Sequence, residues 1–235
     1  MKDYFQNLYL SAERLNTANI VQALTITGPH ANFLDVGCWD GNNTEIWAKA
    51  AKAKAVFGIE PVRAAGQKAV KKNIKVLFVK ADREKWPLNN SSMDCIVTNQ
   101  VVEHLSDIDF FLKESSRVLK KNGYLVVSTN NLSSWHNIFA LLFGWAPFDL
   151  SNASEIKSGL GNPLAIHRYK DNQWGKSWTH KCIYTSKWFS DWCLLYGLKL
   201  HSQYGSGYYP LPAGVGNMNK THCALMTLVF QKNGL

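Results

Sequence analysis

Acidic and amide side chains stand at the ends of four short apolar segments, where a chain usually leaves a buried strand. Carboxylates accept hydrogen bonds from hydroxyl and amino groups. Glu60 comes nineteen positions after Gly41, a spacing that suits a carboxylate bound to the two hydroxyls of a ribose. Asp82 would then accept a hydrogen bond from an adenine amino group. The four groups are Asp35 with the turn residues Gly37 and Gly41, Glu60 with Pro61, Asp82, and Asn99 with Gln100.

The segments between these groups predict the elements that hold them. Strands and helices in alternation predict an α/β fold, a doubly wound, mostly parallel sheet of seven strands with helices on both faces. Ligands of such sheets bind beyond the carboxyl ends of the strands, where all four groups lie. Gly123 is expected to stop one helix by taking the left-handed conformation. The expected strands are 32–36, 55–59, 75–79, 95–98, 124–128, 198–203 and 223–231, and the expected helices are 42–53, 62–72, 107–119, 133–143 and 185–196.

The length of 235 residues fits one domain with a sizeable core. We expect a helical segment at 1–31, a core at 32–129 that carries the binding groups, and a last helix with two strands at 182–235. Between them, 130–181 follow the fifth strand as an insertion rich in Trp, Gly, Pro and Asn. We predict that this insertion moves as a lid over the site.

Cysteine usage and hydropathy indicate the compartment. Five scattered cysteines form no Cys-x-x-Cys pair, which argues against a disulfide framework and a zinc knuckle. The polar first turns lack the apolar core of a signal peptide, and no apolar run reaches the roughly 18 residues of a transmembrane helix. We therefore expect a cytoplasmic protein without a transmembrane segment. The stretch 138–147 comes closest to such a run, and a surface that touches lipid is compatible with this expectation.

The net charge of +9 favours polyanions as partners. The lysines are nevertheless spread over predicted helix ends and exposed helix faces, and no RNA- or DNA-binding motif occurs. Nucleic acid is therefore the less favoured class of substrate.

The segment 33–129 resembles a known family. It reads LDVGC at 34–38, GIEP at 58–61, MDCIVTNQVVEHL at 93–105 and FLKESSRVLKKNGYLVVSTNN at 111–131. This combination is similar to the Rossmann-like S-adenosylmethionine (SAM) dependent methyltransferases, in particular their broad small-molecule group. The resemblance implies SAM as the methyl donor and S-adenosylhomocysteine as the product. By this resemblance, Asp35 and Gly37 bind the methionine part of the cofactor, and Glu60 binds the ribose. Asp82 binds the adenine, and Asn99 and Gln100 lie beneath the sulfonium. The remaining residues of the cofactor loops are Cys38, Trp39, Gly41 and Pro61.

One residue departs from the family pattern, because Trp39 stands where the family has its middle glycine. We expect the indole to swing out and pack over the adenosine. The same turn argues against a dinucleotide cofactor, which needs Gly-x-Gly-x-x-Gly so that a pyrophosphate can approach the helix. Here only Gly37 and Gly41 occur, with the large Trp39 between them.

Three histidines are candidates for the general base that a hydroxyl acceptor requires, because the unperturbed pKa of histidine is about 6.5. His104 follows the fourth strand, and His136 and His180 lie at the borders of the insertion. Some relatives that methylate ribose or catechol hydroxyls hold a divalent metal with Glu-x-x-Glu-His and a later histidine. Here Gln100 replaces the first acid of that motif, and an amide is a poorer ligand for a hard cation. We therefore expect no metal.

Aromatic residues of the insertion have two interpretations, a cap packed on the helices of the sheet or the wall of an acceptor pocket. The loop 205–212, which carries Tyr208, would form a second wall. The aromatic residues are Trp135, Phe139, Phe143, Trp145, Phe148, Trp174 and Trp178.

The sequence thus predicts a SAM-dependent methyltransferase for a small-molecule, sugar or lipid-linked acceptor, with transfer to oxygen or nitrogen. A protein that binds SAM without catalysis, as a sensor or a partner subunit, is the alternative from another class. An RNA methyltransferase is less favoured. The identity of the acceptor and the oligomeric state are left open.

Overall fold

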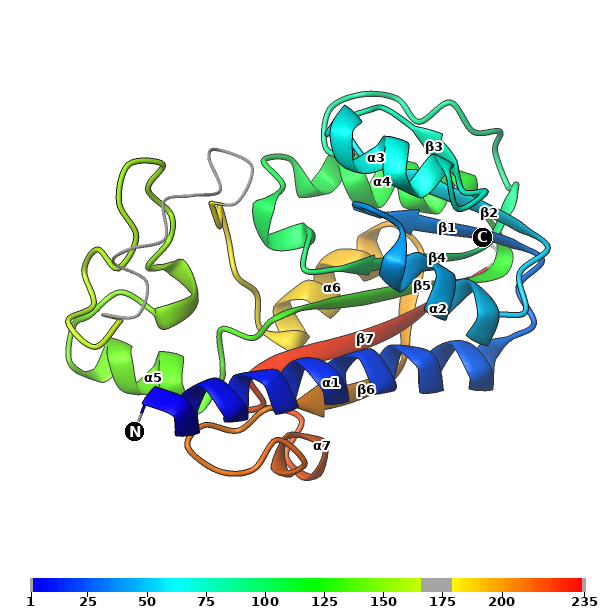
Figure 1. The fold of residues 1–235 in the computed structure, drawn as a ribbon. Coiled ribbons are helices and arrows are strands. Elements are labelled where there is room, and N and C mark those ends of the chain that lie inside the picture. The colour runs from blue at the N-terminus through cyan, green and yellow to red at the C-terminus, as the bar shows by residue number, and fades with distance from the viewer. Residues whose placement is uncertain (1, 166–178, 234–235) are drawn as a thin grey trace.

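A computed structural model describes residues 2–165 and 179–233, and within them the chain forms one seven-stranded sheet (Figure 1). The strand order is β3-β2-β1-β4-β5-β7-β6. All neighbours pair in parallel except β7, which is antiparallel to β5 and β6. The predicted mostly parallel α/β sheet is confirmed. The strands are β1 (Asn32–Val36), β2 (Ala55–Ile59), β3 (Lys75–Leu77), β4 (Met93–Asn99), β5 (Leu119–Asn130), β6 (Leu198–Ser206) and β7 (Leu225–Lys232).

Helices cover both faces of this sheet, as Figure 1 shows. On one face lie α1 (Lys2–Thr27), α2 (Asn42–Ala50) and α3 (Arg63–Val70). On the other lie α4 (Ile108–Val118) and α6 (Ser186–Leu195). The 3-10 helix η1 (Val102–His104) follows β4. Beyond β5 come α5 (Trp135–Leu142) and the 3-10 helix η2 (Phe148–Leu150), and α7 (Val215–Met218) precedes β7.

The central strands are apolar on both faces, as expected for a sheet covered by helices on each side. Phe33 and Val97 pack in one cluster with α1 and α2. Leu34 and Ile96, one residue away in each strand, pack in another with α4 and α6. Successive side chains of a strand point to opposite faces, so each strand needs an almost continuous apolar run. This explains why the central strands could be predicted from apolar runs in the sequence.

The predicted stop of α4 at Gly123 is wrong. The helix ends at Val118, and Leu119 is already extended and pairs with Met93 of β4. Asn122 takes the left-handed conformation with φ 63°. A Cβ at Gly123 would lie 3.0 Å from the backbone oxygen of Asp94, so glycine serves close approach to the neighbouring strand there.

The insertion after β5 is described only in part. The expected helix at 133–143 is present as α5. Trp174 and Trp178, two of the aromatic residues that could cap the sheet or line an acceptor pocket, lie outside the described residues. Movement of the insertion as a lid, and the domain boundaries themselves, stay predictions. In the parts that the structure describes, no helix is both long enough and apolar enough to cross a membrane.

A buried amide anchors α1 to the sheet. Asn16 donates from Nδ2 to Oδ1 of Asn99 at 2.9 Å. Its own Oδ1 accepts hydrogen bonds from Ser128 at 2.7 Å and from Thr227 at 3.0 Å. The N-terminal helix thereby fixes the orientation of a side chain at the end of β4, a role that the sequence did not reveal.

We expect Asn16→Ala to lower the free energy of unfolding in urea, because it leaves buried partners unpaired at a cost of roughly 1–3 kcal/mol each. Thr25→Ala is the matched control. Thr25 lies on the same helix but is exposed, and its hydroxyl bonds only to the oxygen of Val21. Equal stability of the two variants would contradict the anchoring role.

Candidate active site

The predicted cofactor residues meet at the carboxyl ends of β1 and β4. These two strands are neighbours, and the strand order reverses between them. Ligands of open α/β sheets bind at such a switch point because the loops on either side diverge and leave a crevice. The carboxyl end of β2 adjoins β1 and brings Glu60 to the same edge.

Asp35 is buried at the end of β1. Its Oδ2 accepts a hydrogen bond from Thr44 at 2.6 Å, while its Oδ1 has no hydrogen-bond partner among the described residues. Burial raises the pKa of this carboxyl to about 7, and the nearby Glu60 adds to the shift. A buried carboxylate oxygen without a donor is costly, so this atom is suited to a cationic ligand group.

The turn after Asp35 depends on its two glycines. Gly37 has φ 84° and Gly41 has φ 80°, values that favour glycine. A Cβ at Gly37 would collide with Val101, and one at Gly41 would lie 2.6 Å from Ile74. The turn is therefore held close to its surroundings, and side chains larger than hydrogen are not tolerated at these two positions.

Glu60 closes the turn from β2. Its Oε2 accepts from the backbone N–H of Trp39 at 3.1 Å, and its Oε1 accepts from Val62 at 2.8 Å. Burial raises its pKa, and the two backbone hydrogen bonds oppose that shift. The second lone pair of each oxygen is the feature that suits the predicted ribose contact.

The other three residues of the predicted cofactor loops, Trp39, Cys38 and Pro61, differ in how exposed their side chains are. The Trp39 side chain is 42% exposed on a backbone with φ 46°. Its packing over adenosine stays a prediction. Cys38 packs its side chain against Ala69 and Ile74 below the turn, so only its backbone is available to a cofactor. Pro61 is exposed at the end of β2.

Asp82 joins two loops at the rim of the crevice. Its Oδ2 accepts from the backbone N–H of Ser106 at 2.8 Å, which links the loop after β3 to the loop after β4. Arg83 lies 3.4 Å from its Oδ1. The proposed adenine contact would therefore add to a structural role in the loops.

Asn99 and Gln100 end β4 beside the turn. Gln100 takes the left-handed conformation with φ 54°, and its backbone N–H donates to Ser128 at 2.8 Å. Its side-chain Nε2 is buried without a hydrogen-bond partner among the described residues. The Asn99 side chain is held by Asn16, and the role of Asn99 and Gln100 as a floor beneath the sulfonium stays a prediction.

Glu103, which the sequence offered only as the second acid of the disfavoured metal motif, was not among the predicted site residues. It is fully buried, its Oε2 accepts from Thr129 at 2.8 Å, and its Oε1 has no hydrogen-bond partner among the described residues. Burial raises its pKa to about 7. The signal was a carboxyl placed between Val102 and His104 directly after a buried strand, where an acid has no packing role.

His104 and His180 meet beside Glu103. Their ring centroids are 4.8 Å apart, and the nitrogen and oxygen ligand atoms of the three residues lie within 4.8 Å of one another. His104 Nδ1 is 3.2 Å from the oxygen of Thr179, and burial lowers the pKa of this histidine. The backbone N–H groups of Lys181 and Cys182 both bond to the oxygen of Glu103, which draws the end of the insertion to η1.

His136 lies farther from this cluster. Its Nε2 is 3.1 Å from Oδ2 of Asp149, and the backbone oxygen of Asp149 bonds to Nδ1 of His180. The third candidate base is thus connected to the first two through η2. This placement favours His104 and His180 as the groups that face the reacting atoms.

The outward aromatic side chains of α5 do not surround this cluster. Trp135, Phe139 and Phe143 are each substantially exposed. Trp135 Nε1 does donate to the Tyr208 hydroxyl at 2.7 Å, which joins the insertion to the 205–212 loop. That this loop forms a second wall of an acceptor pocket stays a prediction.

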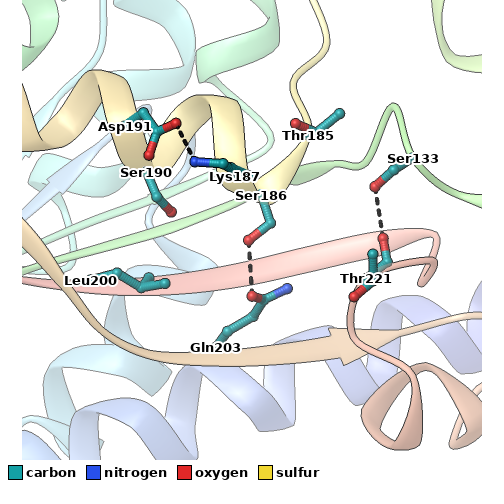
Figure 2. A pocket seen from close by; sticks show the side chains of 9 residues that line it. All are labelled: Ser133, Thr185, Ser186, Lys187, Ser190, Asp191, Leu200, Gln203 and Thr221. Carbon is teal, nitrogen blue, oxygen red and sulfur yellow. Dashed lines mark hydrogen bonds and ion pairs between the residues drawn. The ribbon is translucent and has the colours of Figure 1, made fainter.

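A cavity of about 520 Å³ lies elsewhere, between α6 and the edge strand β6 (Figure 2). Hydroxyl groups of α6 and the Gln203 side chain line it, and Ser186 donates to Gln203 across it at 2.8 Å. None of the predicted cofactor residues borders it. The predicted cofactor residues gather instead at the carboxyl ends of β1, β2 and β4.

The doubly wound sheet, the glycine turn and the acids at successive strand ends define a Rossmann-like nucleotide-binding protein. Residues 34–127 match the methyltransferase domain family. This match, which covers the cofactor half of the chain, supports a class I SAM-dependent methyltransferase.

Relatives and solved structures agree with this assignment. The chain is 33% identical over 121 residues to the ubiquinone biosynthesis O-methyltransferase of Pelagibacter ubique, covering 47% of this chain and 46% of the relative. It is 31% identical over 98 residues to the ubiquinone/menaquinone biosynthesis C-methyltransferase of Campylobacter jejuni, covering 40% and 42%. The matches thus span less than half of these relatives. A SAM-dependent methyltransferase of Thermotoga maritima has the same fold, with a TM-score of 0.60, 18% identity and coverage of 99% and 96%.

Proposed function

We propose that this protein transfers a methyl group from SAM to a hydroxyl of an aromatic, lipid-linked acceptor. The observation that carries the proposal is the meeting of two clusters at one switch point. Asp35 and Glu60 form a cofactor cradle, and Glu103, His104 and His180 form a titratable cluster at the neighbouring strand end.

The proposed reaction assigns a task to each cluster. SAM, when bound, supplies a methyl group on a positively charged sulfur. Asp35 Oδ1 accepts hydrogen bonds from the ammonium of the methionine part, and Glu60 binds the ribose. His104 or His180 takes the proton of the acceptor hydroxyl as its oxygen forms the bond to carbon and the carbon–sulfur bond breaks. The protein contributes alignment and proton removal, which are the main demands of an in-line displacement.

Transfer to oxygen is favoured over nitrogen because a hydroxyl needs a base and the site offers one. Burial keeps the pKa of His104 below its usual value, so its neutral form prevails at neutral pH. The lipid-linked aromatic acceptor is supported by the name of the Pelagibacter relative, an O-methyltransferase of ubiquinone biosynthesis. The Campylobacter relative transfers to carbon by name, so the chemistry of the site carries the choice of atom.

The expectation that no metal takes part stays a prediction. One carboxylate and two imidazoles at this separation would also suit a divalent cation of the zinc or iron type. Dialysis against a chelator separates the two cases. Full activity afterwards supports the histidine base, whereas loss that Zn²⁺, Fe²⁺ or Mg²⁺ restores assigns the cluster to a metal.

The function is tested by calorimetry with SAM and then by mass spectrometry of a panel of acceptors. The panel holds prenylated catechols and phenols, matching amines, sugars and RNA. Methylated prenyl-phenol with unmodified amines supports the proposal. Binding of SAM without turnover across the panel would instead favour a sensor or partner subunit. Methylation of RNA, together with an affinity for RNA that falls steeply with salt, would favour an RNA methyltransferase.

The affinity for SAM should depend on pH through Asp35. Its pKa of about 7 means that the carboxyl is partly protonated in the free protein at neutral pH. The ammonium of SAM requires the ionised form, so affinity should fall by up to about tenfold per pH unit below pH 7. Calorimetry between about pH 5.5 and 8, a range that brackets this pKa, measures the slope. Asp35→Asn should bind weakly with a flat profile, and a wild-type profile that is also flat would refute the assignment.

A further inference from the structure

Helix α5 presents most of its large apolar side chains to solvent, while Asn137 and the small Ala140 are buried. Asn137 is buried, and its Nδ2 donates to Asp149 at 2.8 Å and to the oxygen of Asn131 at 3.1 Å. Trp135, Phe139 and Leu142 follow the i, i+4, i+7 spacing of one helix face, and all three are exposed. A helix on a water-facing surface normally shows the opposite pattern. The pattern indicates that water is not the only environment of this helix.

The outer face of α5, which we define as Trp135, Phe139, Leu141, Leu142 and Phe143, extends beyond the helix. The Phe143 and Trp145 rings stack with centroids 5.1 Å apart. The backbone N–H of Ala146 donates to Gly161 at 2.8 Å, which brings the exposed Leu160 and Leu164 alongside. No Asp, Glu, Lys or Arg occurs between Lys121 and Asp149. The outer face of α5 therefore carries no charge of its own.

Charged residues at the margins are mainly basic. Lys157 is exposed beside Ile156, which is itself 88% exposed, and Glu155 is the acidic neighbour. At the other end, the Trp135 ring lies 4.5 Å from that of His222, close in sequence to the exposed Lys220. The whole chain carries a net charge of +9. An apolar face with basic margins is complementary to the surface of an anionic bilayer.

We infer that the outer face of α5 docks on the surface of a membrane that contains anionic lipids. The aliphatic and phenyl side chains enter the acyl boundary. Trp135, whose Nε1 is bonded to the Tyr208 hydroxyl, remains at the level of the headgroups, where Trp and Tyr are enriched. The helix lies flat on the surface, because its eight residues are too few to span a bilayer.

Docking would place the reaction cluster near the lipid surface. The inner side of α5 contacts Asp149 through Asn137, and the backbone oxygen of Asp149 bonds to His180, which meets His104. An acceptor with a lipid tail would thus have a short path from the membrane to the cluster. This benefit rests on the proposed function, whereas the docking itself does not.

The test is flotation with vesicles in the absence of SAM and of any acceptor, so that its result is independent of methyl transfer. One set of vesicles is pure phosphatidylcholine, and the other contains about one part phosphatidylglycerol to three parts phosphatidylcholine, to supply the anionic surface. We expect the full chain to float with the anionic vesicles and less with the neutral ones. Leu142→Ser combined with Phe143→Ser should lower the partition coefficient roughly tenfold or more.

The control is Leu194→Ser combined with Leu195→Ser. Leu195 is 80% exposed and Leu142 is 79% exposed, while Leu194 and Phe143 are 56% and 58% exposed. The two pairs are thus matched in accessibility, and each substitution pair removes two large apolar side chains. Leu195 ends α6 close to Leu198, where β6 begins, whereas α5 follows Asn130 at the other end of the paired strands β5, β7 and β6. An unchanged affinity for SAM shows that each variant is folded.

Two results would overturn the inference. The first is an equal loss of vesicle binding in both pairs of variants, or no vesicle binding by the wild-type chain. The second is a concentration-dependent dimer that the Leu142/Phe143 pair dissociates while vesicles have no effect, because the face would then join two copies of the chain.

Discussion

Glu60→Ala should weaken SAM binding by roughly ten- to a hundredfold, because losing a hydrogen bond to a charged group costs about 1.5–3 kcal/mol. Two effects add. The proposed contact with the ribose hydroxyls is lost, and the backbone N–H groups of Trp39 and Val62 lose the acceptor that holds the turn against β2. Titration calorimetry with SAM at constant pH measures the change. Glu60→Gln keeps an amide oxygen as one acceptor and should fall between wild type and Glu60→Ala.

The control for this experiment is Glu45→Ala. Glu45 lies in the first turn of α2, close to the same site, but its side chain is exposed and its partner is Lys72. The substitution removes the same charge without touching the turn. A Glu60→Ala protein with a normal unfolding transition and unchanged SAM affinity would refute the ribose assignment.

His104→Gln and His180→Gln should each lower the rate of methyl transfer by about 10²–10⁴-fold, the usual contribution of a positioned base. Glutamine retains a donor of similar reach but does not take up a proton near neutral pH. SAM affinity should change little, because neither side chain belongs to the predicted cofactor contacts. The ratio of the two effects identifies which histidine faces the acceptor, and His136→Gln should have a smaller effect since its contact with the cluster passes through Asp149.

His201→Gln is the matched control, since His201 is exposed on β6, far along the sheet from the cluster. Rates are measured in single turnovers with saturating SAM, so that product release does not hide the effect on chemistry. Undiminished transfer in both His104→Gln and His180→Gln would show that neither is the base, and Glu103 would then be the group to test.

Interpretation of the cofactor loops was possible from the sequence because the relevant signals are local. A buried parallel strand is a continuous apolar run, and its carboxyl end is the residue at which the run stops. Asp35, Glu60 and Asn99 each follow such a run, and parallel strands bring their carboxyl ends to one edge. The fold and the positions of these loops could therefore be predicted, although the individual contacts to SAM remain proposals.

The end of α4 shows how local signals fail when a neighbouring strand competes. Gly123 had the residue type of a helix stop, yet pairing of Leu119 with Met93 extends β5 back to the end of the helix. Hydrogen bonds to β4 satisfy the backbone groups there, and the residues around Gly123 do not reveal this pairing because the partner strand lies elsewhere in the sequence.

The sequence by itself determined the α/β class, the order of strands and helices in the cofactor half, and the acids at the strand ends. Only the tertiary structure decided which distant residues meet: His104 with His180, Asn16 with Asn99, and Glu103 with Thr129. It also decided which face of α5 points outward, because helical spacing defines a face but not the direction in which that face is turned. Contacts between residues far apart in the chain depend on how the sheet and its helices pack, and no periodicity within one segment encodes that packing.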